Sequence, residues 1–462
     1  MAPTASEISP ELVAKYDRPG PRYTSYPTVP AWSEAFGPED FERQLDAANE
    51  RRDDSLALYL HLPFCAHRCL FCGCNVVITS RHDVVEEYLA RLFREIEHAA
   101  ECLPDRRRLT GLHWGGGTPT HLDCEQIERV HGKVAQHFAI EPDGEIAIEV
   151  HPPETTREQL ETLRRLGFNR ISLGVQDLDT EVQQVIERWQ TVEQTERLLD
   201  WSRELGFRSV NFDLIYGLPA QTPDTWELTL RETLRMRPDR LAIYSYAHVP
   251  WIKPHQNRMP GDRLPDAETK MALFRHARRR LLDGGYVEIG MDHFALPQDE
   301  LARAVSDRRL YRNFMGYTVR PAADFLGLGA SAISEVGHAF AQNSGKLNRW
   351  SEAVDAGRFG TERGFRLSLD DRVRKLVIER LMCNLQVRFE EVEALAGAPF
   401  REIFAAQWAQ LAEFEADGLV ERGEHDLTIT SLGRTLIRNV AMLFDAHLPD
   451  PGGDQPIFSR TV

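Results

Sequence analysis

The stretch HLPFCAHRCLFCGCN, residues 61–75, contains four of the seven cysteines of the chain. They are Cys65, Cys69, Cys72 and Cys74, and they follow an apolar run, LALYLHLPF, that predicts a buried strand. A site at the carboxyl end of a strand is where α/β folds place their chemistry. The crowding therefore indicates a metal or catalytic site on a loop after this strand.

The spacing of these thiols distinguishes three interpretations. Buried structural thiols do not need to be crowded. A structural zinc site usually takes two ligand pairs separated by a longer loop, and Cys74 lies too close to Cys72 for both to bind one tetrahedral ion. We favour the third interpretation, a cubane iron–sulfur cluster, because thiolates are its usual ligands. Three cysteines would hold three irons and leave the fourth iron open to a small molecule.

Apolar runs alternate with helical patterns from about residue 55 to residue 295. The runs lack strict polar alternation, which is typical of strands buried on both faces. This order predicts an α/β fold with a parallel sheet, and six strands predict a partial (β/α)6 TIM-like barrel that is open on one side. Thr155 and Glu158 predict a capping box for one of the helices, and residues 286–295 predict one further strand. The six predicted strands are 56–61, 109–115, 145–151, 170–176, 209–216 and 240–248.

The pattern changes after residue 365, where helices are followed by a small hairpin and another helix. That order resembles a winged helix, but the region carries more acidic than basic residues, so it lacks the electrostatic footprint of a DNA-binding domain. We predict four parts. They are an N-terminal arm (1–54), the barrel (55–300), a barrel extension and linker (301–365), and a mainly helical, winged-helix-like C-terminal domain (366–462).

The composition of the chain indicates which classes of binding partner and which cellular location to expect. The formal net charge of −16 disfavours binding to nucleic acid or to an anionic membrane. No stretch is long and apolar enough to span a bilayer, and the N-terminus lacks the apolar core of a signal peptide. We therefore expect a cytoplasmic protein with no nucleic-acid or membrane partner. Thiols stay reduced in the cytosol, which favours metal binding over disulfides.

Further polar and glycine-rich motifs end the predicted strands. HWGGGTPT, residues 113–120, places three glycines where backbone approaches a ligand or makes a tight turn. Glu149, in EIAIEVHP, is a carboxylate on a largely apolar strand, and it is costly to bury without a partner. It therefore predicts either a ligand contact or a salt bridge inside the barrel. Gln176, Asp213 and Ala247 end later strands and are expected to face the barrel mouth.

The C-x-x-x-C-x-x-C motif, with Phe71 before its last cysteine, resembles that of the radical S-adenosylmethionine (SAM) superfamily. In that superfamily the open iron binds the amino and carboxylate groups of SAM, and an electron from the cluster releases a 5′-deoxyadenosyl radical. Along nearly its whole length the chain also resembles the oxygen-independent coproporphyrinogen III oxidase (dehydrogenase) family. The motifs that carry this resemblance are GPRYTSYPT (20–28), YLHLPFCAHRCLFCGCN (59–75), HWGGGTPT (113–120), IEV (148–150), FNRISLGVQD (168–177), FDLIYGLPAQTP (212–223), YAH (246–248), GMDHFA (290–295), RNF-GYT (312–318), LGLGASAIS (326–334) and RNVAMLFD (438–445).

The resemblance implies an activity, cofactors and a set of site residues. The implied reaction is oxidative decarboxylation of two propionates of coproporphyrinogen III to vinyl groups, which gives protoporphyrinogen IX in haem biosynthesis. The implied cofactors are one [4Fe–4S] cluster, ligated by Cys65, Cys69 and Cys72, and two SAM molecules. The residues implied to contact the cluster-bound SAM are Tyr59, Gly116, Glu149 and Ile333. Those implied to contact the second SAM are Phe71, Gly117, Thr118, Gln176, Arg188, Asp213 and Ala247. The implied catalytic residues are Tyr59, His61, Cys74, Glu149 and Phe314.

The resemblance also implies binding partners, and it leaves two alternative functions open. An electron donor must reduce the cluster, an electron acceptor must oxidise the substrate, and we expect a monomer because the arm and C-terminal domain would cover the barrel rim. Arg22 and Arg188 are candidates to pair with the four carboxylates of the substrate. The rivals are a haem-binding chaperone of the same family, whose members lack the arm and the equivalent of Cys74, and another tetrapyrrole-acting radical SAM enzyme. Met315, where the family has Gln, and His151 with Pro153 depart from the family pattern.

Overall fold

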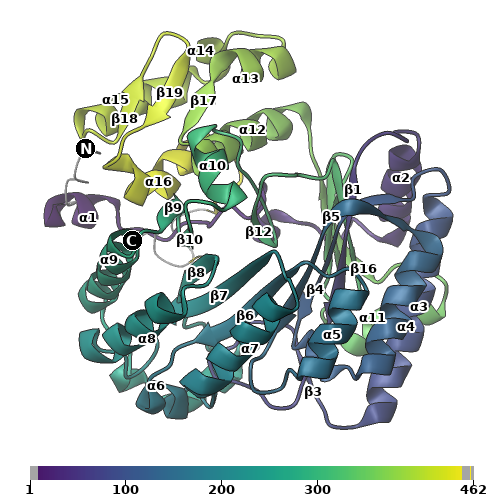
Figure 1. Cartoon of the computed structure of the whole chain (residues 1–462). Helices are drawn as coiled ribbons and strands as arrows, with labels where there is room; N and C mark the ends of the chain where they lie inside the picture. The colour runs from purple at the N-terminus through teal and green to yellow at the C-terminus, as the bar shows by residue number, and fades with distance from the viewer. Residues whose placement is uncertain (1–8, 450–457, 459–462) are drawn as a thin grey trace.

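The computed structural model describes residues 9–449 and residue 458. Its largest element is a twelve-stranded sheet with the order β16-β15-β14-β13-β1-β4-β5-β6-β7-β8-β10-β9 (Figure 1). Six strands in the middle of this sheet are parallel and follow one another in chain order, which confirms the predicted parallel sheet. They are β1 (Leu56–Leu62), β4 (Arg108–Gly116), β5 (Ala139–Val150), β6 (Arg170–Gln176), β7 (Ser209–Tyr216) and β8 (Arg240–Ser245).

Both edges of this parallel sheet are extended. Beyond β1, β13 (Asp324–Leu328) pairs in parallel, and β14 (Ile333–Val336), β15 (Ala339–Asn343) and β16 (Thr361–Arg366) add antiparallel strands. Beyond β8, the prediction of a single strand at residues 286–295 is wrong. The chain instead forms two antiparallel strands, β9 (Val287–Gly290) and β10 (His293–Ala295), because Met291 turns it with a φ of +42°.

Helices cover the outer face of the sheet (Figure 1). Each turns an apolar stripe inward, as amphipathic helices of α/β folds do; in the first of them Val85, Leu89 and Leu92 are buried. The predicted capping box lies one residue further along the chain, where the Thr156 side chain accepts a hydrogen bond from the Gln159 amide. These helices are α3 (His82–Cys102), α4 (Cys124–His137), α5 (Arg157–Arg165), α6 (Thr180–Val185), α7 (Val192–Glu204), α8 (Pro223–Met236) and α9 (Ala267–Asp283), with α11 (Leu347–Asp355) beside α3.

Shorter elements complete the barrel and its N-terminal arm. The arm contains α1 (Pro10–Tyr16) and α2 (Pro38–Asn49), and β2 (Phe64–Cys65) pairs with β3 (Val77–Ile78) at the cysteine loop. After β10 come α10 (Glu300–Ser306) and a hairpin of β11 (Tyr311–Asn313) and β12 (Gly316–Thr318). Within residues 9–449 no helix combines the length and apolarity needed to cross a bilayer.

The C-terminal region is mainly helical and has its own apolar core. A three-stranded antiparallel sheet, in the order β17-β19-β18, lies among its helices, and the buried Tyr16, Tyr23 and Tyr26 of the arm belong to the same core. The winged-helix label and the four domain limits remain predictions. The elements are α12 (Leu369–Asn384), β17 (Gln386–Arg388), α13 (Phe389–Ala396), α14 (Phe400–Ile403), α15 (Ala405–Ala416), β18 (Val420–Arg422), β19 (Asp426–Ile429) and α16 (Ile437–Ala441).

Candidate active site

The cysteine loop leaves the carboxyl end of β1 and is held by distant parts of the barrel. The Leu70 amide donates a hydrogen bond of 2.9 Å to the Ile186 carbonyl, and the buried Leu70 side chain anchors the loop in a small apolar cluster. From the segment after β8, His255 Nε2 lies 2.8 Å from the Cys72 carbonyl oxygen. The loop is therefore fixed over the ends of several strands.

The free cysteines of this loop are the residue type that ligates an iron–sulfur cluster. All cysteines of the described chain are free. Cys65 Sγ lies 3.6 Å from Thr118 Oγ1, and Arg188 Nη1 donates to Cys69 Sγ at 3.5 Å. Burial, with a smaller contribution from the neighbouring Cys72 and Cys69, raises the pKa of the Cys65 thiol to about 11. A bound cation deprotonates a coordinating thiol, so a metal centre would hold Cys65 as the thiolate.

Gly116, the last residue of β4, and Gly117, which follows it, are required by close packing against His61 and the start of the cysteine loop. A Cβ on Gly117 would lie 2.6 Å from the Phe64 carbonyl oxygen. Gly116 has a φ of +113°, and a Cβ there would lie 2.5 Å from the His61 ring. The Thr118 amide then donates to the Phe64 carbonyl at 2.7 Å. These glycines therefore bring the two loops together, a reason for the motif that differs from the expected approach of backbone to ligand.

Glu149 faces the same region from β5. Its carboxylate accepts a hydrogen bond of 3.1 Å from the Gly116 amide and lies 3.4 Å from His113 Nε2. Burial acts to raise the pKa of Glu149, but the hydrogen bonds and charge of His113 and the Gly116 amide outweigh it, and the pKa is lowered. An ionised carboxylate at this position can bind an ammonium group.

Tyr59 and His61 form a chain of polar contacts beneath the cysteine loop. The His61 ring is buried, and burial lowers its pKa, so the ring is neutral. Its Nε2 lies 3.0 Å from the Asn75 carbonyl and therefore carries the proton, which leaves Nδ1 to accept a 3.0 Å hydrogen bond from the Tyr59 hydroxyl. Cys74, next to Asn75, is exposed.

A second set of predicted residues gathers beside Cys69. Arg188 Nη2 donates to the Gly174 carbonyl at 2.5 Å, and a Cβ on Gly174 would lie 3.0 Å from Gln176 Nε2. Gln176 ends β6 with a φ of +66°. The structure thus brings Arg188 and Gln176 together at the cluster loop. His151, one of the departures from the family pattern, is buried nearby with its Nδ1 3.1 Å from Glu154.

Phe71 and Ala247 are bridged by one side chain. Gln256 Nε2 donates to the Phe71 carbonyl at 3.1 Å and to the Ala247 carbonyl at 3.3 Å. Phe71 is half-buried and Ala247 is exposed. The cysteine loop and the end of β8 are therefore neighbours, as they would have to be to form the predicted second SAM site.

Two predicted residues lie on the far edge of the site. The Phe314 ring packs against Trp32 and Phe340, with centroids 6.1 and 6.2 Å away, so it contacts the arm and β15. Ile333 is the half-buried first residue of β14. Met315, next to Phe314, does line the barrel cavity. The catalytic role of Phe314 and the cofactor role of Ile333 stay predictions.

The barrel holds an open cavity of about 190 Å³ that is lined by both polar and apolar side chains. Glu149 and Asp213 both line it. Asp213 accepts hydrogen bonds from Ser172 Oγ at 2.8 Å and Asn211 Nδ2 at 2.9 Å, and burial raises its pKa to about 6. Sequence reasoning missed Ser172 and Asn211, although a polar side chain within an otherwise apolar strand was an available signal.

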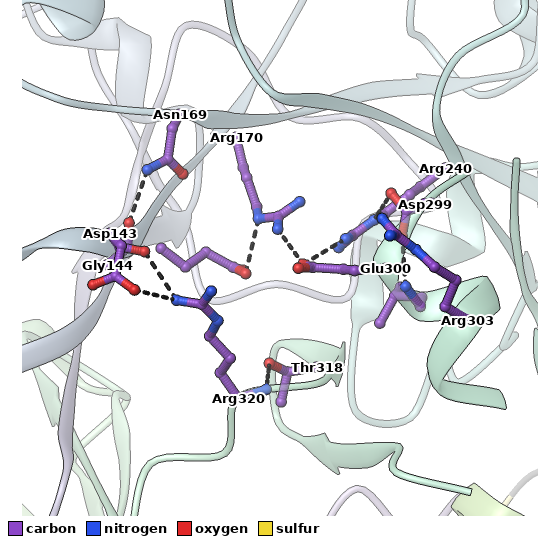
Figure 2. Close-up of polar contacts among 12 residues, drawn as sticks. Asp143, Gly144, Asn169, Arg170, Arg240, Asp299, Glu300, Arg303, Thr318 and Arg320 are labelled. Carbon is purple, nitrogen blue, oxygen red and sulfur yellow. Dashed lines mark hydrogen bonds and ion pairs between the residues drawn. The ribbon is translucent and has the colours of Figure 1, made fainter. Parts of the chain in front are cut away.

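The opposite end of this cavity is lined by paired charges (Figure 2). Arg170 and Arg240 are the first residues of β6 and β8. Arg170 pairs with Glu300 and, at 2.8 Å, with Glu145, while Arg240 pairs with Asp299 at 2.9 Å and with Glu300 at 3.1 Å. None of these residues was singled out from the sequence.

Comparisons with known proteins agree with this geometry. The model of the radical SAM superfamily matches residues 59–233, and that of the HemN C-terminal domain matches residues 367–436. An oxygen-independent coproporphyrinogen III oxidase from Pseudomonas aeruginosa is 43% identical over 456 residues, covering 98% of both chains. That from Escherichia coli (strain K12) is 42% identical over 451 residues, again covering 98% of both.

A solved structure extends the likeness to the fold. The coproporphyrinogen III oxidase of Escherichia coli, described as a radical SAM enzyme, superposes with a TM-score of 0.91 at 40% identity, covering 96% of this chain and 100% of that one. The matched part of the chain covers the barrel, the cysteine loop and the C-terminal region. The chain therefore belongs to the oxygen-independent coproporphyrinogen III oxidase family of radical SAM enzymes.

Proposed function

We propose that this protein decarboxylates coproporphyrinogen III without oxygen, converting two propionates to vinyl groups and yielding protoporphyrinogen IX for haem biosynthesis. The observation that carries the proposal is one assembly at the carboxyl ends of the barrel strands. There, the loop that carries Cys65, Cys69 and Cys72 lies against the glycine-rich end of β4, and the ionised Glu149 accepts a hydrogen bond from the Gly116 amide and lines the barrel cavity. Full-length relatives with this activity in their names support it.

The residues of the loop suit the cofactors of this family. Cys65, Cys69 and Cys72 would hold a [4Fe–4S] cluster, which with bound SAM supplies a 5′-deoxyadenosyl radical. Glu149 would receive the amino group of the cluster-bound SAM, because its carboxylate is ionised and reaches the cavity. Arg188 and Gln176, which meet beside Cys69, would bind polar groups of a second SAM.

The chain's own groups position the substrate more than they transfer protons. Each reacting propionate gives up one hydrogen atom, one CO₂ and one electron, and its two side-chain carbons become a vinyl group. No protein base is needed for that balance. Tyr59 and the neutral His61 hold the floor of the site through the Asn75 carbonyl. Precise placement of the propionate is then the main contribution of the protein.

The same proposal implies redox partners, an oligomeric state and a cellular location. An electron donor must reduce the cluster, and a separate acceptor must take one electron from each substrate radical. We infer a monomer, because the arm and the C-terminal domain of the same chain share a core over the barrel, and a cytoplasmic location, where thiols stay reduced.

Turnover tests the proposal. The protein is reconstituted anaerobically with iron and sulfide and incubated with coproporphyrinogen III, SAM, a reductant and an acceptor-containing cell extract. The expected products are protoporphyrinogen IX and 5′-deoxyadenosine. SAM cleavage without vinyl product would point to another tetrapyrrole substrate, and stable haem binding with transfer to an acceptor protein would point to the chaperone.

A further inference from the structure

A half-buried lysine lies at the rim of the barrel where β7 and β8 end. Lys270 is the fourth residue of α9, a 17-residue helix. Gly217, directly after β7, leaves room for its stem, since a Cβ there would lie 2.8 Å from Lys270 Cε. The Lys270 ammonium donates a 2.7 Å hydrogen bond to the Tyr246 carbonyl, one residue before Ala247. The ammonium is therefore held next to the predicted second cofactor site.

Lys270 has fewer acceptors than an ammonium needs. An ammonium carries three donors, yet the Tyr246 carbonyl is the one acceptor within hydrogen-bond distance of Lys270 among the described residues, and no described carboxylate pairs with it. A cation in this part of a helix also opposes the helix dipole, which favours negative charge near the amino end. Stability alone gives no reason for a lysine here, whereas an incoming anion would satisfy both the donors and the dipole.

Two guanidinium groups approach Lys270 from distant parts of the chain. Arg22 comes from the N-terminal arm and Arg438 from α16. Burial, with smaller contributions from the charges of Arg22 and Arg438, lowers the pKa of Lys270 to about 8. Arg22 Nη1 donates to Asp292 at 2.8 Å, and Arg438 Nη1 donates to the Gly20 carbonyl at 3.3 Å. Three cations thus converge at one place, although bringing like charges together costs free energy.

We propose that Lys270, Arg22 and Arg438 form a binding site for a propionate carboxylate of coproporphyrinogen III. This inference rests on the proposed function and adds to it the residues that recognise the substrate's charge. Four propionates enter with the substrate and two are converted, so a carboxylate remains available to anchor the macrocycle throughout the reaction. A carboxylate accepts several hydrogen bonds at once, and charge-assisted bonds of this kind are the strong ones.

The site also explains why three separate segments meet here. The arm supplies Arg22, α9 supplies Lys270 and the C-terminal region supplies Arg438, all near the ends of β7 and β8. The substrate's charge would then stabilise the closure of these segments over the barrel mouth. A purely structural role for Lys270, tying α9 to β8, would need only its bond to the Tyr246 carbonyl.

Binding of a fluorescent probe tests the proposal. The anaerobically reconstituted holoenzyme is titrated with coproporphyrin III, which has four carboxylates, and with its tetramethyl ester, which has none. The variants are Lys270→Met, Lys270→Arg as a charge-conserving rescue, and Arg275→Met as a matched control, because Arg275 is an exposed cation of the same helix. SAM binding is measured in parallel.

We expect Lys270→Met to weaken coproporphyrin III binding about 10- to 100-fold, as loss of a charge-assisted hydrogen bond does. Its KM for coproporphyrinogen III should rise by a similar factor, with binding of the ester and of SAM unchanged. Lys270→Arg should restore most of the affinity, and Arg275→Met should match the wild type. The proposed carboxylate site would be refuted if Lys270→Met bound coproporphyrin III with wild-type affinity. It would also be refuted if the variant lost the same factor of affinity for coproporphyrin III and for its tetramethyl ester.

The same experiment separates this inference from the proposed function. If the wild type makes vinyl product while Lys270→Met keeps the wild-type KM, the carboxylate site is wrong and the proposed function stands. If the wild type makes no vinyl product from coproporphyrinogen III, the proposed function is wrong, and the assignment of the site to this substrate is refuted with it.

Discussion

The two ends of the barrel cavity are both rich in charge, but they use it differently. At the amino ends of the strands, Arg170 and Arg240 are satisfied by carboxylates of the same chain. At the carboxyl ends, Arg188 contacts a carbonyl and a thiol, and Lys270 contacts one carbonyl. Paired charges hold the fold together, whereas cations without carboxylate partners mark places where a ligand supplies the opposite charge.

The largest difference between the two ends should follow from removing a cluster ligand. Cys69→Ser should abolish cluster retention and lower activity by more than about 100-fold, since loss of even outer partners of a metal site costs about 10- to 100-fold. Iron and sulfide content, measured beside turnover, check this. Cys124→Ser, a cysteine outside the loop in α4, is the control and should retain both. A Cys69→Ser protein with a full complement of iron would refute the ligand assignment.

Glu149→Gln should separate cofactor binding from stability. The amide keeps the shape of the side chain but loses the charge that meets an ammonium, so SAM binding should weaken by about 10- to 100-fold. The free energy of unfolding should change little, because the carboxylate lines an open cavity. Isothermal titration with SAM and urea unfolding measure the two quantities. Undiminished SAM affinity would remove Glu149 from the proposed site.

Glu300→Gln should give the opposite result at the other end. Glu300 pairs with both Arg170 and Arg240, so the change leaves two partly buried guanidinium groups short of a charge partner. The free energy of unfolding should fall by about 1–3 kcal/mol, with SAM affinity unchanged. If Glu300→Gln weakens SAM binding as much as Glu149→Gln does, the contrast between the two ends does not hold.

The smallest effect should be a pH dependence due to Asp213. Its pKa is raised to about 6 in the folded protein, against about 3.9 for an unperturbed aspartate. The folded state therefore binds the proton more tightly, so this group's stabilising contribution is present below about pH 4 and is lost as the pH rises through about 6.

In Asp213→Asn, the decrease in the free energy of unfolding that accompanies ionisation of Asp213 should be absent. Urea unfolding of both proteins at several pH values between 4 and 7 compares them directly, since other titrating groups are common to both. The wild-type curve should fall relative to that of the variant across this range. Parallel curves would show that Asp213 does not titrate with a raised pKa.

The site at the carboxyl ends of β1 to β8 was largely predictable, because its residues lie in short motifs at strand ends. The cysteine spacing, the glycine turn and Glu149 are local signals, and parallel strands bring such ends to one edge of a sheet. What sequence could not supply is the reason for the glycines. Gly116 and Gly117 pack against His61 and Phe64, contacts between loops that are set by tertiary structure.

Two local details and the contacts between distant segments were not predictable. The β9–β10 hairpin depends on a single turn at Met291 within a run that otherwise predicts one strand. Capping by Thr156 was assigned one residue too early, since two adjacent threonines offer the same signal. The approach of Arg22 and Arg438 to Lys270 joins residues from three parts of the chain, and only the folded structure brings them together.

The central claim is that this cavity decarboxylates a tetracarboxylate substrate by radical chemistry. Anaerobic turnover of the reconstituted wild type with coproporphyrinogen III and SAM, read by chromatography of the oxidised porphyrins, tests it most directly. The account predicts protoporphyrin IX together with 5′-deoxyadenosine, and neither from Cys69→Ser. Formation of 5′-deoxyadenosine by the wild type with coproporphyrin III as the sole porphyrin recovered would contradict it.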